Sequence, residues 1–166
     1  MSTDAIVLLK DDHKELKKLF KDFRGAGPNA TATKGKIVSK IIAALTKHTY
    51  IENEGMYPQV RELAPDLEAD ILESYEEHHV ADLLVMELTA MEAKDERFDA
   101  KTTVLIENVE HHIAEEEDEW FPKVREQLSR KQLQDIGAHL IELKKKAPTS
   151  PAQPSAIKKT IDAIIK

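Results

Sequence analysis

The sequence predicts an all-α protein, an up-down four-helix bundle with additional C-terminal helices. Its 166 residues include only 5 glycines and 7 prolines beside 41% hydrophobic and 33% charged residues, which is typical of helical proteins. Apolar residues recur with a helical period in long stretches joined by short connections, which favours antiparallel neighbours. The histidine pattern of the first half also returns in the second. We therefore expect two helical hairpins that pair around a shared interior.

The first helix is expected to begin close to the N-terminus. Ser2 or Thr3 can cap it, and its apolar positions follow a helical period that includes His13. The apolar stripe ends near Gly25, and residues 25–33 indicate a loop because glycine, proline, asparagine and threonine cluster there. The first connection of the bundle is placed at this loop.

The second and third helices are expected on either side of a short turn. The second carries His48 on its apolar face, and Gly55 and Pro58 are expected to end it. Pro65 and the aspartate that follows it open the third helix, whose apolar residues share a face with His78. Each helix thus brings one histidine to the interior.

The fourth helix is predicted to carry His112 and to end at about Leu128. Ser129 and Gln132 resemble a capping box that starts a fifth helix. The expected organisation is a four-helix bundle over residues 1–128, an accessory helix packed on it over 129–147, and a linker with a short amphipathic helix over 148–166. The bundle is therefore the part of the chain expected to carry a functional site.

Composition excludes several classes of function. The net charge of −7 opposes nucleic-acid binding because no basic field attracts phosphates. The absence of cysteine excludes disulfides, thiolate metal ligands and cysteine nucleophiles. No apolar run approaches the roughly 20 residues of a membrane helix, and the N-terminus lacks a basic leader. We expect a cytoplasmic protein without a membrane or nucleic-acid partner; a protein partner is not indicated.

A short phrase, His-x-x-x-Glu, occurs twice. One copy is formed by His48 and Glu52 and the other by His112 and Glu116, and in both an aromatic residue and a proline follow, the proline ten residues after the histidine. Residues four apart stack on one face of a helix, so each copy presents an imidazole beside a carboxylate. A metal site requires such a pairing of donors, and a buried glutamate is disfavoured unless it is paired or binds a metal.

The remaining histidines extend the repeat. His13 precedes His48 by 35 residues, and His78 precedes His112 by 34. On the third helix both faces are partly apolar, so the choice between His78 and His79 stays open, with His78 preferred and His79 close behind. His111 is expected to be a surface or supporting residue. Tyr75 is expected to be a core aromatic, with a hydrogen-bond donor near the site or a phenolate ligand as the alternative. The candidate metal ligands are His13, His48, Glu52, His78, His79, His112 and Glu116.

Histidine and glutamate donors without cysteine suit iron, manganese or zinc. Two carboxylates that face each other are suited to bridge two cations, so a dinuclear centre follows more naturally than a mononuclear one. The ferritin-like alternative needs Glu-x-x-His on two helices, and only Glu76 with His79 has that spacing. A metal-free helical module, with its histidines as packing residues, is the other alternative, and the repeat disfavours it.

These residues resemble the hemerythrin-like proteins, specifically their bacterial HHE-type cation-binding branch, from roughly Ile6 to Leu128. The resemblance implies a cofactor of two Fe ions in a bridged non-heme centre inside a four-helix bundle. It implies that Glu52 and Glu116 bridge, and that the terminal ligands are His13, His48, His78 or His79, and His112.

The resemblance also implies a function. Such proteins bind dioxygen, sense oxygen or redox state, handle iron, or decompose hydrogen peroxide. Oxygen-carrying hemerythrins have two histidines four apart on the third helix, whereas Ser74 and Asp82 flank His78 here. This difference disfavours reversible oxygen carriage and favours reaction with peroxide, including a catalase-like enzyme activity. The alternative is an iron-homeostasis protein, or one that binds nitric oxide without turnover.

Overall fold

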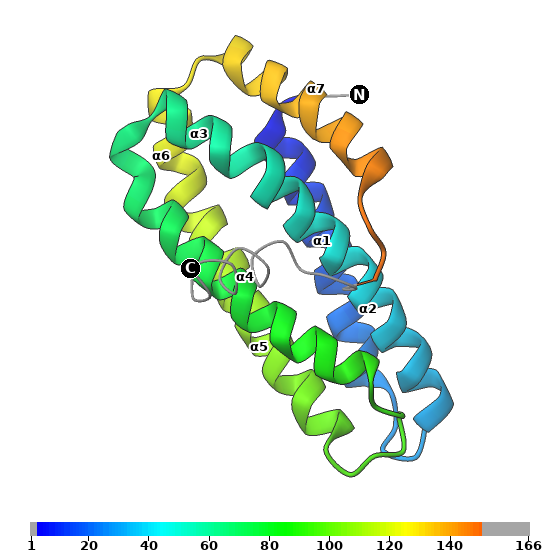
Figure 1. Ribbon diagram of the computed structural model, residues 1–166. Helices are drawn as coiled ribbons and strands as arrows, with labels where there is room; N and C mark the ends of the chain where they lie inside the picture. The colour runs from blue at the N-terminus through cyan, green and yellow to red at the C-terminus, as the bar shows by residue number, and fades with distance from the viewer. Residues whose placement is uncertain (1–2, 151–166) are drawn as a thin grey trace, which may run out of the picture.

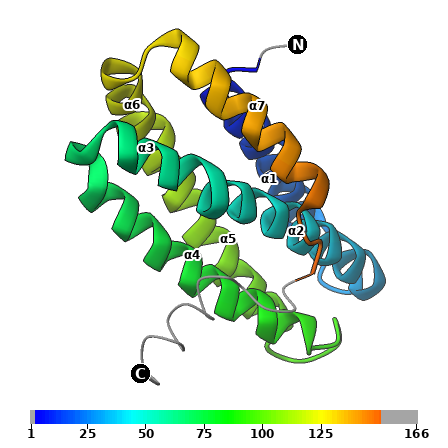
Figure 2. The ribbon, with the colours of Figure 1, turned by 45° about the horizontal axis from the view of Figure 1, so that its top comes forward.

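The computed structural model describes residues 3–150, and each of its elements in that range is helical (Figure 1). The four long helices are α1 (Ala5–Gly25), α2 (Thr31–Ile51), α4 (Glu68–Thr89) and α5 (Phe98–Glu115). They run alternately up and down, and α1 packs along α2 as α4 packs along α5 (Figures 1 and 2). The predicted up-down four-helix bundle is confirmed.

Two of the long helices continue through a widened turn. After α2 and α5 come the π-helical turns η1 (Glu52–Met56) and η3 (Glu116–Trp120), followed by α3 (Tyr57–Leu63) and α6 (Phe121–Gln127). The expectation that Pro58 ends the second helix was wrong. Proline has no N–H group, and its ring clashes with the carbonyl four residues earlier. The π turn accommodates it, because the Tyr57 N–H bonds to the Glu52 carbonyl five residues back.

The helix caps use short polar side chains. Asp4 caps α1, and its carboxylate accepts hydrogen bonds from the N–H groups of Ile6 and Val7 at 2.9 and 3.2 Å. The N-cap of α1 is therefore Asp4 and not Thr3 as expected, and Ser2 lies outside the described residues. A 3₁₀ turn, η2 (Pro65–Leu67), precedes α4.

The last described helix, α7 (Arg130–Lys146), lies across α1, α2 and η1 (Figure 2). It begins with the predicted capping box of Ser129 and Gln132. Two glycines allow α7 to pack closely against the bundle. A Cβ on Gly137 would lie 1.5 Å from the Thr3 carbonyl oxygen, and one on Gly55 would lie 2.6 Å from a methyl group of Leu140. Gly55 therefore serves packing and does not end the second helix as expected.

The core has two apolar clusters with a polar layer between them. One includes Tyr57 and Trp120 near α7, and the other includes Phe20 and Leu105 toward the opposite end of the bundle. In α1, α2 and α4 the candidate histidine lies between residues of the two clusters, and on the α5 side Glu116 does so. Within residues 3–150, no helix has the length and apolar character needed to cross a membrane. The helix predicted around Ile157 lies outside the described residues.

Candidate metal centre

Six of the seven candidate ligands meet inside the bundle. They come from α1, α2, α4 and α5 and from the first residues of the two π turns. No residue of this set is more than 6% exposed: His13, His48, Glu52, His78, His112 and Glu116. A polar group this deeply buried needs a partner, because its transfer from water is otherwise strongly unfavourable.

Four of these side chains form a first group, which we call subsite A: His13, His48, Glu52 and Glu116. One donor atom from each lies within 4.8 Å of the others. The His13 Nε2 atom is 3.4 Å from Glu116 Oε1, and His48 Nε2 contacts Glu52 Oε1. Two imidazoles and two carboxylates thus surround one point.

A second group, subsite B, consists of Glu52, His78 and His112, again with donor atoms within 4.8 Å of one another. The Nε2 atoms of His78 and His112 are 3.1 Å apart, and Glu52 Oε2 is 4.0 Å from His78 Nε2. Glu52 therefore offers one oxygen to each subsite. Glu116 Oε1, which belongs to subsite A, is also 3.1 Å from His112 Nε2.

Every histidine of the cluster is held by its other ring nitrogen. In each, Nδ1 lies within hydrogen-bond distance of a side-chain oxygen from a different helical segment. These contacts join His13 to Glu117 at 2.9 Å, His48 to Asp12 at 3.1 Å, His78 to Asn53 at 2.7 Å and His112 to Glu77 at 3.2 Å. An oxygen acceptor at Nδ1 fixes the tautomer with its proton there, which leaves the Nε2 lone pair free toward the interior.

One of these acceptors also contacts α7. Asp12 accepts a hydrogen bond from Lys144 with one oxygen while the other faces His48. Burial alone would raise the pKa of Asp12, but the bonds and charges of His48 and Lys144 hold it below its ordinary value. Asp12 therefore remains an ionised acceptor that orients the imidazole of His48.

The donor atoms of subsite A fit a cation. Nε2 of His13 and His48 and Oε1 of Glu52 and Glu116 are buried, and their close polar contacts are with other donor atoms of the same cluster. Lone pairs of imidazole and carboxylate that converge on one buried point are suited to hold a cation. Imidazole and carboxylate donors suit a first-row metal ion such as iron, manganese or zinc.

Tyr57 is a site residue that sequence reasoning missed. Its hydroxyl donates to Glu52 Oε2 and lies 3.3 Å from Nε2 of both His78 and His112 and 3.4 Å from Glu116 Oε2. The equivalent position in the second copy of the phrase is Phe121, whose ring stacks on the imidazole of His13 at 5.8 Å. The two halves of the centre thus differ by one phenolic hydroxyl.

A family model, the hemerythrin HHE cation binding domain, matches residues 4–124. The chain belongs to this family. A similar solved structure is the HHE cation binding domain-containing protein of Mycobacterium kansasii, with 20% identity, a TM-score of 0.71 and 86% of each chain covered. At that identity the likeness shows the fold alone. No match was found among curated proteins. The predicted family is confirmed, and its buried histidine and glutamate cluster is compatible with metal binding.

The other polar candidates lie apart from the donor cluster formed by subsites A and B. His79 is half-buried and belongs to neither subsite, although its Nδ1 atom is buried without a hydrogen-bond partner in the described structure. Tyr75 is half-buried, and its hydroxyl donates to the Asn53 carbonyl at 3.4 Å. His111 is exposed and pairs with Glu115 at 2.9 Å. Of the two adjacent histidines on α4, the structure thus brings His78 to the centre.

The charges of the imidazoles and carboxylates in subsites A and B compensate one another. Burial by itself lowers the pKa of His48, but the carboxylate of Glu52 raises it to about 10. Burial and the neighbouring His112 lower the pKa of His78 to about 3. Burial would raise the pKa of Glu116, yet the imidazole of His112 holds it well below its usual range. Protons on imidazole therefore balance the carboxylates, and a bound cation would compete with those protons.

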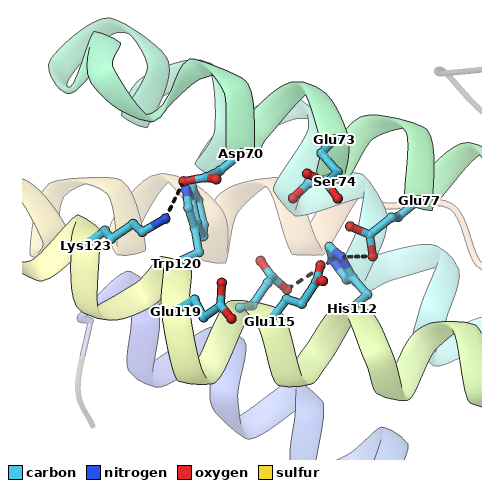
Figure 3. A pocket seen from close by; sticks show the side chains of 10 residues that line it. Asp70, Glu73, Ser74, Glu77, His112, Glu115, Glu119, Trp120 and Lys123 are labelled. Atoms are coloured by element: carbon cyan, nitrogen blue, oxygen red, sulfur yellow. Dashed lines mark hydrogen bonds and ion pairs between the residues drawn. The ribbon is translucent and has the colours of Figure 1, made fainter.

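An open cleft leads from the surface to the HHE centre (Figure 3). It has a volume of about 80 Å³ and reaches His112 and Glu116 between α4 and the α5–α6 segment. A smaller cavity lies on another side of the same imidazoles. Its lining joins His48, His78 and His112 to apolar residues that include Leu45, Ala81, Val109 and Ile113. One approach to the donors is thus strongly polar and the other largely apolar.

Proposed function

We propose that this protein is a non-heme diiron protein that binds or reacts with dioxygen or hydrogen peroxide. The proposal rests on the pair of adjoining subsites, which share Glu52. Each of their four imidazole rings is held in place by a hydrogen-bond contact at Nδ1. An anchored ring keeps its Nε2 atom aimed before any cation arrives, which is how metal-binding proteins hold their ligands.

The residues present fit two cations that share carboxylates. Glu52 has one oxygen in each subsite, and Glu116 Oε1 is near both His13 Nε2 and His112 Nε2. Both carboxylates can therefore bridge. The imidazoles divide evenly, with His13 and His48 in subsite A and His78 and His112 in subsite B. Iron held by such a donor set supplies exchange of electrons with dioxygen or peroxide.

The chain also places a proton carrier at the centre. The Tyr57 hydroxyl donates a hydrogen bond to Glu52, and the pKa of Tyr57 is raised well above the ordinary value by burial and by the charges of Glu116 and Glu52. The phenol is therefore kept protonated. Its hydroxyl can donate a hydrogen bond to an oxygen atom that arrives beside the imidazoles of His78 and His112.

The cavity and the cleft beside the proposed centre are suited to small ligands. The small cavity beside His48, His78 and His112 exposes mainly apolar surface, so it favours an uncharged molecule of a few atoms. Dioxygen and nitric oxide have this character. Hydrogen peroxide is polar and would reach His112 through the open cleft. The apolar cavity also supports a second candidate, binding of nitric oxide or dioxygen without turnover.

The proposal is tested on purified protein by metal analysis and an optical spectrum before and after peroxide. We expect about two iron ions per chain, an absorption that changes with peroxide, and oxygen release from hydrogen peroxide. His112→Ala should reduce the iron content and oxygen release, whereas His139→Ala, at an exposed histidine on α7, should change neither. Protein that takes up no iron refutes the proposed centre. Iron-loaded protein that responds to nitric oxide but releases no oxygen from peroxide favours the second candidate.

A further inference from the structure

Six of the ten residues that line the cleft onto the candidate centre are acidic. Its carboxylates come from α4 on one wall and from α5 and η3 on the other, and the residues are Asp70, Glu73, Glu77, Glu115, Glu116 and Glu119. Figure 3 shows Glu73 and Glu77 facing Glu115 and Glu119 across it. The one lysine of the lining, Lys123, pairs with Asp70 at 3.2 Å. Like charges gathered in a cleft focus the field and attract cations from solution.

A mixed donor group stands beside this cleft. Glu77, His111 and Glu115 each offer one atom, and the three atoms lie within 4.8 Å of one another. His111 Nε2 is 2.9 Å from Glu115 Oε1. The side chains are 68% exposed at His111, 39% at Glu115 and 21% at Glu77. An imidazole with two carboxylates is a donor set for divalent first-row metals and is more selective than an acidic patch.

This outer group is connected to the inner one. The Oε2 atom of Glu77 is 3.2 Å from Nδ1 of His112, a member of subsite B. Farther along the same cleft lies Glu116, which is 1% exposed. Its Oε1 atom faces the Nε2 atoms of His112 at 3.1 Å and His13 at 3.4 Å, so the inner end of the cleft also brings carboxylate and imidazole donors together. The exposure of the donors thus falls continuously from His111 to Glu116.

We propose that Glu77, His111 and Glu115 form an outer cation site that captures a divalent first-row metal ion and delivers it along the acidic cleft to His112 and Glu116. The delivery step rests on the proposed metal centre. The outer site depends only on its own three donor residues, so experiments can refute the outer site and the inner metal centre independently.

The test counts bound Mn²⁺ by the loss of its free-ion electron paramagnetic resonance signal. The test variant is His111→Gln with Glu115→Gln, since neither residue belongs to subsite A or B. The matched control is His139→Gln with Glu142→Gln, an exposed histidine and glutamate on α7 away from the cleft. We expect about three ions per chain in the wild type and the control, and about two in the test variant. Equal counts in wild type and test variant overturn the outer site.

Delivery is tested by the rate at which full-length metal-free protein takes up Fe(II) in stopped flow without oxygen. Electrostatic capture changes association rates by about 10- to 1,000-fold at low ionic strength. We expect uptake in the test variant to be about tenfold slower than in the control, with the difference shrinking as salt is added. Equal uptake rates overturn the delivery role. A wild type that binds one Mn²⁺, lost in the test variant, retains the outer site and refutes the inner centre.

Discussion

The hydroxyl of Tyr57 gives a sharp test of the polar centre, because Tyr57→Phe removes one oxygen atom and leaves the ring. In the metal-free protein this hydroxyl is the hydrogen-bond donor to Glu52 Oε2, and both side chains are fully buried. A buried hydrogen bond to a charged group contributes about 1.5–3 kcal/mol. Phenylalanine occupies the equivalent position in the second half, at Phe121, so the widened turn accepts it. The change therefore isolates the hydrogen bond from packing.

For a chain of this length, about 1 kcal/mol shifts the midpoint of thermal unfolding by roughly 2–4 °C. A loss of about 2 kcal/mol predicts a decrease of roughly 4–8 °C for metal-free Tyr57→Phe. The assay is thermal and urea unfolding followed by circular dichroism after chelation. Tyr75→Phe is the matched control, because its hydroxyl is half-buried and only 3.4 Å from a carbonyl acceptor. We expect it to change stability by less than about 0.5 kcal/mol. Equal midpoints for Tyr57→Phe and wild type would refute the assigned hydrogen bond.

Three further changes test the support of the centre, the docking of α7 and a buried acid. Asn53→Ala removes the acceptor at 2.7 Å from His78 Nδ1 and should weaken metal binding by about 10- to 100-fold in chelator competition; unchanged affinity would contradict this. Gly137→Ala places a Cβ about 1.5 Å from the Thr3 carbonyl oxygen and should lower stability by about 1–3 kcal/mol in urea unfolding, and an unaltered midpoint would argue against that contact. Burial raises the pKa of Asp82 from 3.8 to about 7, so the folded state binds more protons than the unfolded state between these values and stability falls as pH rises through them. Asp82→Asn should therefore stabilise the protein more at pH 8 than at pH 5, and an equal gain at both would refute the shift.

Helical periodicity predicted most of the bundle and six of the gathered side chains. An α-helix returns to the same face after three or four residues, so the two His-x-x-x-Glu phrases fixed the register of α2 and α5. On α4 the same reasoning left His78 and His79 unresolved. The structure shows why, because Leu72, Leu83 and Met86, which share the face of His79, are more than 40% exposed. In the sequence, these exposed apolar residues cannot be distinguished from a stripe that faces the core.

Tyr57 could not be found with α-helical geometry. Five residues of an ordinary α-helix advance about 500°, which places Tyr57 roughly 140° away from Glu52 around the axis. The π turn after Glu52 has hydrogen bonds five residues apart, and it returns Tyr57 to the interior face. The available signal was the proline that follows an aromatic residue at the same place in both halves, Pro58 and Pro122. A proline inside a helix that continues marks a local change of register.

The four contacts at Nδ1 together form a closed circuit through the bundle. One joins α2 to α1, the next α1 to η3 beyond α5, the third α5 to α4, and the last α4 to η1 beyond α2. A closed circuit has no free end, so no helix can shift without misaligning an imidazole on its neighbour. A cation bound by these four imidazoles would therefore also stabilise the packing of the four helices against one another.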